Sequence, residues 1–109
     1  MIIYEVNLQI STEILATYVN WLHPHIQKML KFPGFVTVFC LKEHKNDPQY
    51  TYLSLQYHIS TQAHLDDYLQ HHAQKMREEA QAFQGQFSAS RRIFTLDTPD
   101  QLAALLFEN

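Results

Sequence analysis

The chain has 109 residues, of which 46% are hydrophobic, 13% aromatic and 17% charged, and its formal net charge is -3 at pH 7. This length and hydrophobic content are typical of one folded domain with a single core, which we expect over residues 1–109, and they exclude a disordered chain. The negative charge removes the broad basic surface that non-specific nucleic-acid binding requires, so we expect no nucleic-acid partner.

The N-terminal residues and the single cysteine indicate a cytoplasmic protein. Met1 to Asn7 contain no positively charged segment, and Glu5 interrupts them, so they are not typical of a signal peptide. No apolar run approaches the length that crosses a membrane, so we expect no membrane association. Cys40 cannot form an internal disulfide, and because it lies in an apolar stretch we interpret it as a buried core thiol.

The first part of the chain predicts a strand followed by a helix. Residues 2–10 alternate, with the even positions apolar, which is typical of a strand. Ser11 or Thr12 can cap the following helix, and Trp21 and His25 fall on the flank of its apolar stripe. The stripe itself consists of Ile14, Leu15, Tyr18, Leu22, Ile26, Met29 and Leu30. Pro24 lies inside this pattern, so we expect a kink or a break into two helical pieces there.

After the stop at Pro33-Gly34, the sequence predicts a β-hairpin. Residues 35–41 form a nearly unbroken run of β-branched and aromatic residues, and residues 50–59 alternate cleanly. The segment Asn46-Asp47-Pro48 between them is typical of a turn.

The remaining chain predicts a helix, a strand and a short final helix. Ser60 or Thr61 caps a helix whose apolar spacing continues to Phe83, and Gly85 ends it. Residues 86–96 form a fourth strand, in which we allow for a bulge because the alternation is imperfect. Thr98-Pro99-Asp100-Gln101 then begins a short helix with the pattern of a capping box.

The order of these elements predicts an α+β, ferredoxin-like βαββαβ domain with a four-stranded antiparallel sheet plus a C-terminal helix. In this fold both main helices cover one face of the sheet and leave the other bare. We expect the bare face to carry a polar and aromatic set that forms either a ligand pocket or a dimer contact, namely Glu5, Asn7, Tyr50, Tyr52, Gln56, His58 and Arg92. The second strand offers two apolar sets, and either can lie on this face.

Such a face is too polar for an ordinary core and too aromatic to be left exposed, so we expect a homodimer closed through the sheet face. Two sheets paired in this way would enclose a barrel-like space. Glu5, His58 and Arg92 can converge there as a carboxylate, a base and an anion-binding group, or they can form a network of hydrogen bonds at the interface.

Two histidines are candidate catalytic residues, together with Arg92. His25 and His72 each lie on or beside the apolar stripe of a helix, so they can face a pocket between helices and sheet as acid–base groups or haem ligands. The alternative is that each is a partly buried histidine with a structural hydrogen bond. The histidine spacing does not predict a metal site, and we expect no cofactor. Arg77-Glu78-Glu79 is interpreted as a solvated helix face.

Several short motifs, taken in order, resemble an uncharacterised family of short bacterial proteins, a domain of unknown function within the dimeric α/β-barrel, ferredoxin-like superfamily. The motifs are Met1 to Val6, Trp21-Leu22 with His25-Ile26, Phe35 after a short turn, the strand with Tyr57, Tyr68-Leu69 with His72-Ala73, and Phe87 before Arg91-Arg92. The resemblance extends to about Leu96. Pro24 stands before His25 where we expect an acidic residue, which argues against proton transfer by that pair.

The resemblance implies no single activity, because the superfamily includes cofactor-independent monooxygenases, isomerases, haem-degrading enzymes and plain binding proteins. The chain shows no nucleophile–base pair, so our first hypothesis is a dimeric small-molecule-binding or interaction module without established catalysis. The alternative is a monooxygenase- or isomerase-like enzyme acting on a small, partly apolar substrate. In that case His25 or His72 is the base, and Arg92 or a tyrosine stabilises negative charge. A third hypothesis is haem binding through His25 or His72.

Overall fold

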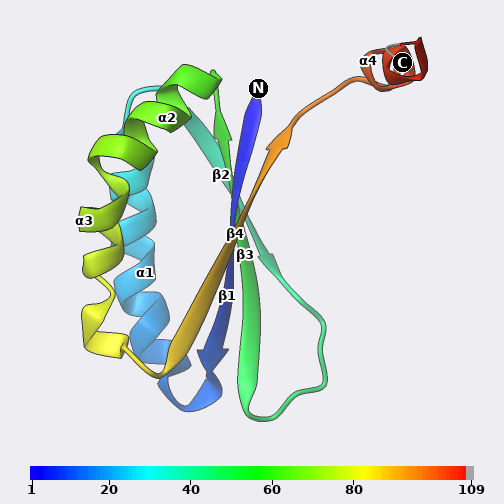
Figure 1. Cartoon of the computed structure of the whole chain (residues 1–109). Helices are drawn as coiled ribbons and strands as arrows, with labels where there is room; N and C mark the ends of the chain where they lie inside the picture. The colour runs from blue at the N-terminus through cyan, green and yellow to red at the C-terminus, as the bar shows by residue number, and fades with distance from the viewer. Residues whose placement is uncertain (108–109) are drawn as a thin grey trace.

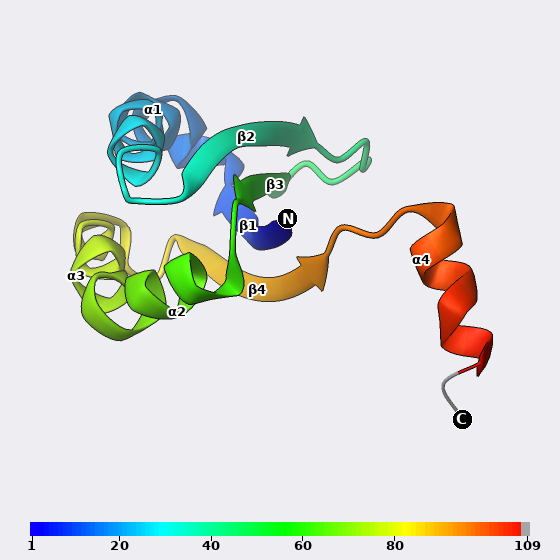
Figure 2. The same cartoon turned by 90° about the horizontal axis from the view of Figure 1, so that it is seen from above.

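The computed structural model describes residues 1–107, so the last two residues of the predicted domain lie outside the described range. Within this range, four strands form one antiparallel sheet in the order β2-β3-β1-β4. Their bounds are β1 Ile2–Ser11, β2 Phe35–Lys42, β3 Tyr50–Ile59 and β4 Phe87–Thr95. Three helices, α1 (Leu15–Met29), α2 (Gln62–His71) and α3 (Ala73–Glu78), cover one face and leave the other open (Figures 1 and 2). The predicted ferredoxin-like α+β fold is confirmed.

Strand β1 lies at the centre of the sheet and contributes to both of its faces. It pairs with β3 on one side and with β4 on the other, without a register shift in either pair. Its even positions from Ile2 to Ile10 are buried against the helices. Tyr4 faces the same side as its partners Tyr57 and Ile93, while Glu5 faces the open side together with Gln56 and Arg92.

Helix α1 continues through Pro24 as one element, so of the two predicted alternatives the break into two pieces is wrong, while the kink stays a prediction. The proline removes one backbone hydrogen bond, but it lies on the exposed side of the helix. Tyr18, Leu22 and Met29, which lie on both sides of the proline, are buried against the sheet and hold the helix together across it. Neither Ser11 nor Thr12 caps α1, because a 3-10 turn (η1, Thr12–Ile14) precedes it without a side-chain cap.

The second helical region, which the sequence predicts as one helix, is broken without a proline. Thr61 caps α2 as predicted, with its hydroxyl accepting a hydrogen bond from the His64 backbone N–H. His72 then departs from helical geometry, with φ -129° and ψ -27°, and α3 starts at the next residue. A 3-10 turn (η2, Gln81–Phe83) and Gly85, whose φ is +85°, lead into β4.

The bulge lies in β2 and not in β4. The β2–β3 register shifts between Phe35 and Thr37, whereas β4 pairs regularly with β1. This shift decides between the two apolar sets of the second strand, because it places Phe39 on the open face opposite Gln56. Cys40 is exposed, so its interpretation as a core thiol is wrong, since β2 is an edge strand that the helices do not fully cover.

The β2–β3 turn and the C-terminal helix form as predicted. Asp47 Oδ1 accepts hydrogen bonds from the backbone N–H groups of Gln49 and Tyr50, which closes the turn. Thr98 and Gln101 form a capping box at the start of α4 (Pro99–Ala103), which projects away from the sheet on the side opposite α1–α3 (Figures 1 and 2). None of the helices within residues 1–107 has the length and apolar character needed to cross a membrane.

Candidate functional site

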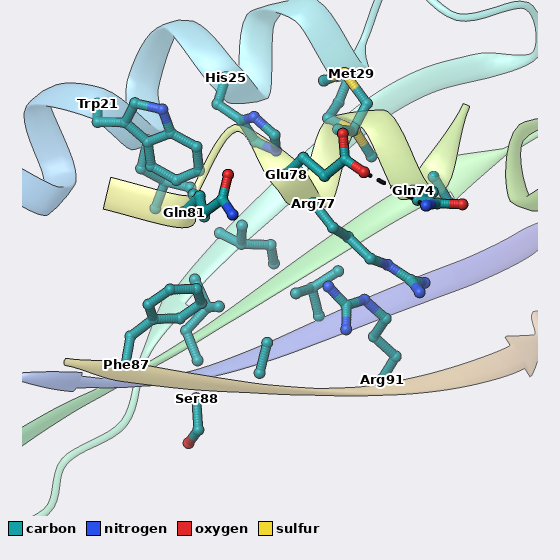
Figure 3. Close-up of a pocket in the computed structure, with 18 of the residues that line it drawn as sticks. Trp21, His25, Met29, Gln74, Arg77, Glu78, Gln81, Phe87, Ser88 and Arg91 are labelled. Atoms are coloured by element: carbon teal, nitrogen blue, oxygen red, sulfur yellow. Dashed lines mark hydrogen bonds between the residues drawn. The ribbon is translucent and has the colours of Figure 1, made fainter. Parts of the chain in front are cut away.

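A cavity of about 780 Å³ lies between the covered face of the sheet and helices α1, α2 and α3 (Figure 3). Side chains of β1, β3 and β4 that point toward the helices form its floor, including Tyr4, Val6, Leu8, Leu55, Tyr57 and Ala89. The helices contribute Tyr18, Trp21, Leu22, His25, Met29, Tyr68 and Met76. The volume lies within the usual range of small-molecule sites, and the wall is mainly apolar and aromatic with a few polar groups.

Small side chains leave this space open. Ala89 of β4 lies opposite Leu8 of β1, where a larger residue would reach toward the helices. Ala73 and Ala80 in the region of α3 are buried and line the cavity from above. Small residues in β4 and around α3 therefore prevent the sheet and the helices from closing completely.

His25 is the histidine of the cavity wall, and Glu79 holds it in place. Its ring points from α1 toward the cavity and stacks on Trp21 with centroids 4.6 Å apart (Figure 3). Its Nδ1 lies 3.1 Å from Glu79 Oε1, while Lys28 Nζ donates to Oε2 of the same carboxylate at 3.2 Å. Because a carboxylate accepts hydrogen bonds, Nδ1 carries the proton and Nε2 is left as an acceptor.

Burial is the largest influence on His25 and lowers its pKa, although the hydrogen bond and the charge of Glu79 favour the protonated ring. The side chain is only 14% exposed. Burial also acts to raise the pKa of Glu79, but its hydrogen bonds with His25 and Lys28 outweigh burial, and that pKa is lowered. The pair therefore consists of a neutral imidazole and an ionised carboxylate at neutral pH.

Four tyrosines add hydroxyl groups around the cavity. Arg77 Nη2 donates to the Tyr4 hydroxyl at 3.2 Å, and the Tyr68 hydroxyl donates to Met29 Sδ at 3.3 Å. The side chains of Tyr18 and Tyr57 also line the cavity.

Burial raises the pKa of Tyr18 and Tyr68 to about 12 and raises the pKa of Tyr57 further. These hydroxyls are therefore protonated at neutral pH and can donate hydrogen bonds to a ligand.

His72, the second predicted histidine, lies outside this cavity. It is the residue at the break between α2 and α3, its ring centroid is 4.7 Å from that of Phe32, and its Nε2 lies 3.9 Å from Asp67 Oδ2. The structure therefore does not bring His25 and His72 together. Within residues 1–107, no cluster of three or more His, Cys, Asp or Glu side chains is placed to hold a metal ion.

The open face of the sheet carries a second polar arrangement, centred on Glu5. Its Oε1 accepts from Asn7 Nδ2 at 2.9 Å and from Arg92 Nε and Nη2 at 2.9 and 2.7 Å, and its Oε2 accepts from Gln56 Nε2 at 2.9 Å. Burial acts to raise the pKa of Glu5, but these hydrogen bonds and the charge of Arg92 outweigh it and lower the pKa. We call Glu5, Asn7, Gln56 and Arg92 the Glu5 network.

The other residues expected on this face lie outside the Glu5 network. The His58 ring packs against Phe39, with centroids 4.7 Å apart. The Tyr52 hydroxyl donates to Asp47 Oδ2 at 2.9 Å, and Tyr50 is exposed near the same turn. Glu5 and Arg92 thus converge as expected, while His58 does not join them.

Sequence reasoning missed the arginines of the cavity. Arg91 lies on the covered face opposite Val6. In the sequence, the irregular alternation of the fourth strand was the pattern that could have placed it there. Arg77 and Glu78 are exposed, as the interpretation of a solvated helix face requires, but Arg77 also reaches Tyr4, and Glu79 holds His25. No pattern in the sequence could show these contacts, because they join residues that are distant along the chain.

We expect His25→Gln to reduce the amount by which the free energy of unfolding decreases in mild acid. A histidine with a lowered pKa binds its proton later in the folded state than in the unfolded state, so the folded state loses stability as the pH falls below the unfolded value of about 6.5. Glutamine does not titrate, so the free energy of unfolding should fall less between pH 7 and pH 5, measured by urea denaturation. His23→Gln, at an exposed position of the same helix, should behave as the wild type; an equal effect of both substitutions would contradict this account.

Solved structures of low sequence identity share this fold. A protein from Deinococcus radiodurans, named provisionally as an antibiotic biosynthesis monooxygenase, superposes with a TM-score of 0.70 at 13% identity, over 90% of this chain and 94% of that chain. SnoaB, a cofactor-independent oxygenase from Streptomyces nogalater, gives 0.65 at 15% identity, over 89% and 94% of the two chains.

A provisionally named antibiotic biosynthesis monooxygenase from Nitrosomonas europaea gives a TM-score of 0.66 at 13% identity, over 90% of this chain and all (100%) of that chain. No curated protein matches the sequence. A protein family does match, over residues 1–96, and it is described as a domain of unknown function, DUF4286. The match spans most of the chain, including all four strands and the whole cavity, and the chain belongs to the DUF4286 family.

Proposed function

We propose that the protein binds a small, largely apolar molecule in the cavity between the sheet and helices α1–α3. The observation that carries this proposal is the cavity itself, whose volume of about 780 Å³ suits a molecule of two or three rings. Trp21 and Tyr18 supply aromatic surface, with ring centroids 5.4 Å apart. The hydroxyls of Tyr18 and Tyr57 supply donors that can orient a polar substituent.

A second candidate function is cofactor-independent oxygenation of such a molecule. The structural similarity to SnoaB supports it, together with the place of His25 on the cavity wall. In this chemistry the substrate loses a proton and then itself reduces O₂. The neutral Nε2 of His25 can accept that proton, while Glu79 stabilises the resulting imidazolium and a tyrosine hydroxyl donates to the oxyanion. The positions of the two histidines give no support to haem binding, because only His25 lines the cavity.

Oxygen uptake measured with a panel of polycyclic phenols and ketones tests the second candidate. If the protein is an oxygenase, at least one compound should consume O₂ above its spontaneous rate, and His25→Gln should slow the reaction by about 100-fold or more. His23→Gln is the control. Tight binding of a panel member without any O₂ uptake would contradict the oxygenase function and would be consistent with the binding function alone.

We also propose that two copies associate through the open face of the sheet. Glu5 is 4% exposed and its partner Arg92 is 65% exposed, so the Glu5 network is only half covered within one chain. Large apolar side chains are exposed on the same face, namely Phe39, Leu41 and Phe94. Helix α4 projects on this side and carries the exposed Leu102, which gives a second copy a further apolar surface (Figure 2).

Binding of N-phenyl-1-naphthylamine, a neutral apolar dye, tests the binding function. The dye should gain fluorescence and accept energy transfer from Trp21, the single tryptophan, which lines the cavity. Ala89→Phe should fill part of the cavity and weaken binding by about tenfold, equivalent to about 1.4 kcal/mol. Ala63→Phe adds the same ring on an exposed face of α2 and should not weaken it. Equal binding by both variants would contradict the proposed site.

Light scattering tests the dimer. We expect a mass of twice the 12.9 kDa of one chain. Phe39→Glu places a charge on the open face and should dissociate the dimer by at least about 100-fold, because an unpaired buried charge costs several kcal/mol. Val19→Glu, at an exposed apolar position of α1, is the matched control and should remain dimeric. A monomeric wild type, or equal dissociation by both variants, would contradict the proposed interface.

A further inference from the structure

Two arginines enter the cavity from opposite layers of the structure. Arg91 comes from β4, on the face that the helices cover, and Arg77 comes from α3 above it. Both line the cavity, and Figure 3 shows their guanidinium groups approaching one another in the space between α3 and β4. We propose that they bind an anionic group, a carboxylate, sulfonate or phosphate, carried by the apolar ligand. This inference rests on the proposed binding function and names the class of its ligand.

Arg77 is held by a hydrogen bond over the sheet, and the charges of both arginines act on the same tyrosine. Arg77 Nη2 donates to the Tyr4 hydroxyl at 3.2 Å, which fixes one guanidinium over β1. Burial raises the pKa of Tyr68 to about 12, and the positive charges of Arg77 and Arg91 both oppose that rise. Both guanidinium groups therefore lie within electrostatic reach of the same hydroxyl.

Neither arginine has a carboxylate partner in the part of the chain that the structure describes. Among residues 1–107, no Asp or Glu oxygen lies within 4.0 Å of a nitrogen of either arginine. Glu78 lines the cavity, but its Oε1 accepts from Gln74 Nε2 at 3.4 Å, and Glu79 is engaged by His25 and Lys28.

Two neighbouring positive charges repel one another, and no carboxylate within residues 1–107 pairs with either of them. An anionic ligand would remove this repulsion and could accept charge-assisted hydrogen bonds from both groups.

The rest of the cavity determines what the anionic group is attached to. Trp21 and Phe87 lie toward one end of the cavity, and the two arginines lie toward the other (Figure 3). Tyr18 packs between the two aromatic rings, with centroids 5.4 Å from Trp21 and 5.2 Å from Phe87. A molecule that spans the cavity therefore meets aromatic surface at one end and positive charge at the other. The predicted ligand is an aromatic or apolar molecule with a terminal acid group.

A pair of dyes separates this inference from the proposed function. 8-Anilinonaphthalene-1-sulfonate has the same ring framework as N-phenyl-1-naphthylamine but carries a sulfonate. The wild type should bind the sulfonated dye more tightly. Arg77→Gln/Arg91→Gln should weaken binding of the sulfonated dye by about 10- to 100-fold, the loss expected for one or two charge-assisted hydrogen bonds. The same variant should bind the neutral dye within twofold of the wild type, which also shows that it is folded.

Lys31→Gln/Lys75→Gln is the matched control, because it removes two positive charges from exposed positions that do not line the cavity. It should leave the affinity for both dyes unchanged. Equal losses in the two double variants, or no loss in either, would overturn the anion site while leaving the binding function in place. If the wild type binds neither dye, the proposed function fails and this inference fails with it. Should the arginine double variant not fold, each single substitution is tested against Lys75→Gln.

Discussion

Strand β1 is the element on which the rest of the structure depends, because it is central in the sheet and its neighbouring residues serve two different surfaces. Tyr4 points toward the helices and receives a hydrogen bond from Arg77, while Glu5 points to the open face and binds Arg92. Antiparallel pairing imposes the same division on β4, where Arg91 and Arg92 face opposite sides. A shift of one residue in this register would exchange the two surfaces and bury the wrong charges.

The two faces are suited to different tasks. The covered face is apolar and aromatic, but small residues in β4 and around α3 keep the layers from closing, which leaves a space that is partly open to solvent, with tyrosine hydroxyls, one histidine and two arginines on its wall. On the open face, the Glu5 network joins three strands through side-chain hydrogen bonds. We therefore propose ligand binding on the covered face and self-association on the open face, whereas the sequence left two places for a ligand, a pocket beside His25 or His72 and the bare face around Glu5.

The sequence predicted features that depend on residues close together along the chain better than features that depend on residues far apart. Periodicity and turn residues gave the strands, the main helices and the open-face position of Glu5 and Arg92, because these depend on neighbours along the chain. The break at His72 was not predicted, and the break expected at Pro24 does not occur, because Tyr18, Leu22 and Met29 pack against the sheet on both sides of the proline. The same applies to the site, where Arg77 meets Tyr4 across 73 positions of sequence.

The most direct test of the central claim is a methyl NMR titration with ¹³C-methyl methionine and N-phenyl-1-naphthylamine. The chain has three methionines, and their positions suit this purpose: Met29 and Met76 line the cavity from α1 and α3, whereas Met1 lies outside it and is exposed. If the ligand enters the cavity, the signals of Met29 and Met76 should shift together with the ring currents of the dye, and the Met1 signal should stay in place. A shift of Met1 alone, or saturation of binding without any change at Met29 and Met76, would contradict the account.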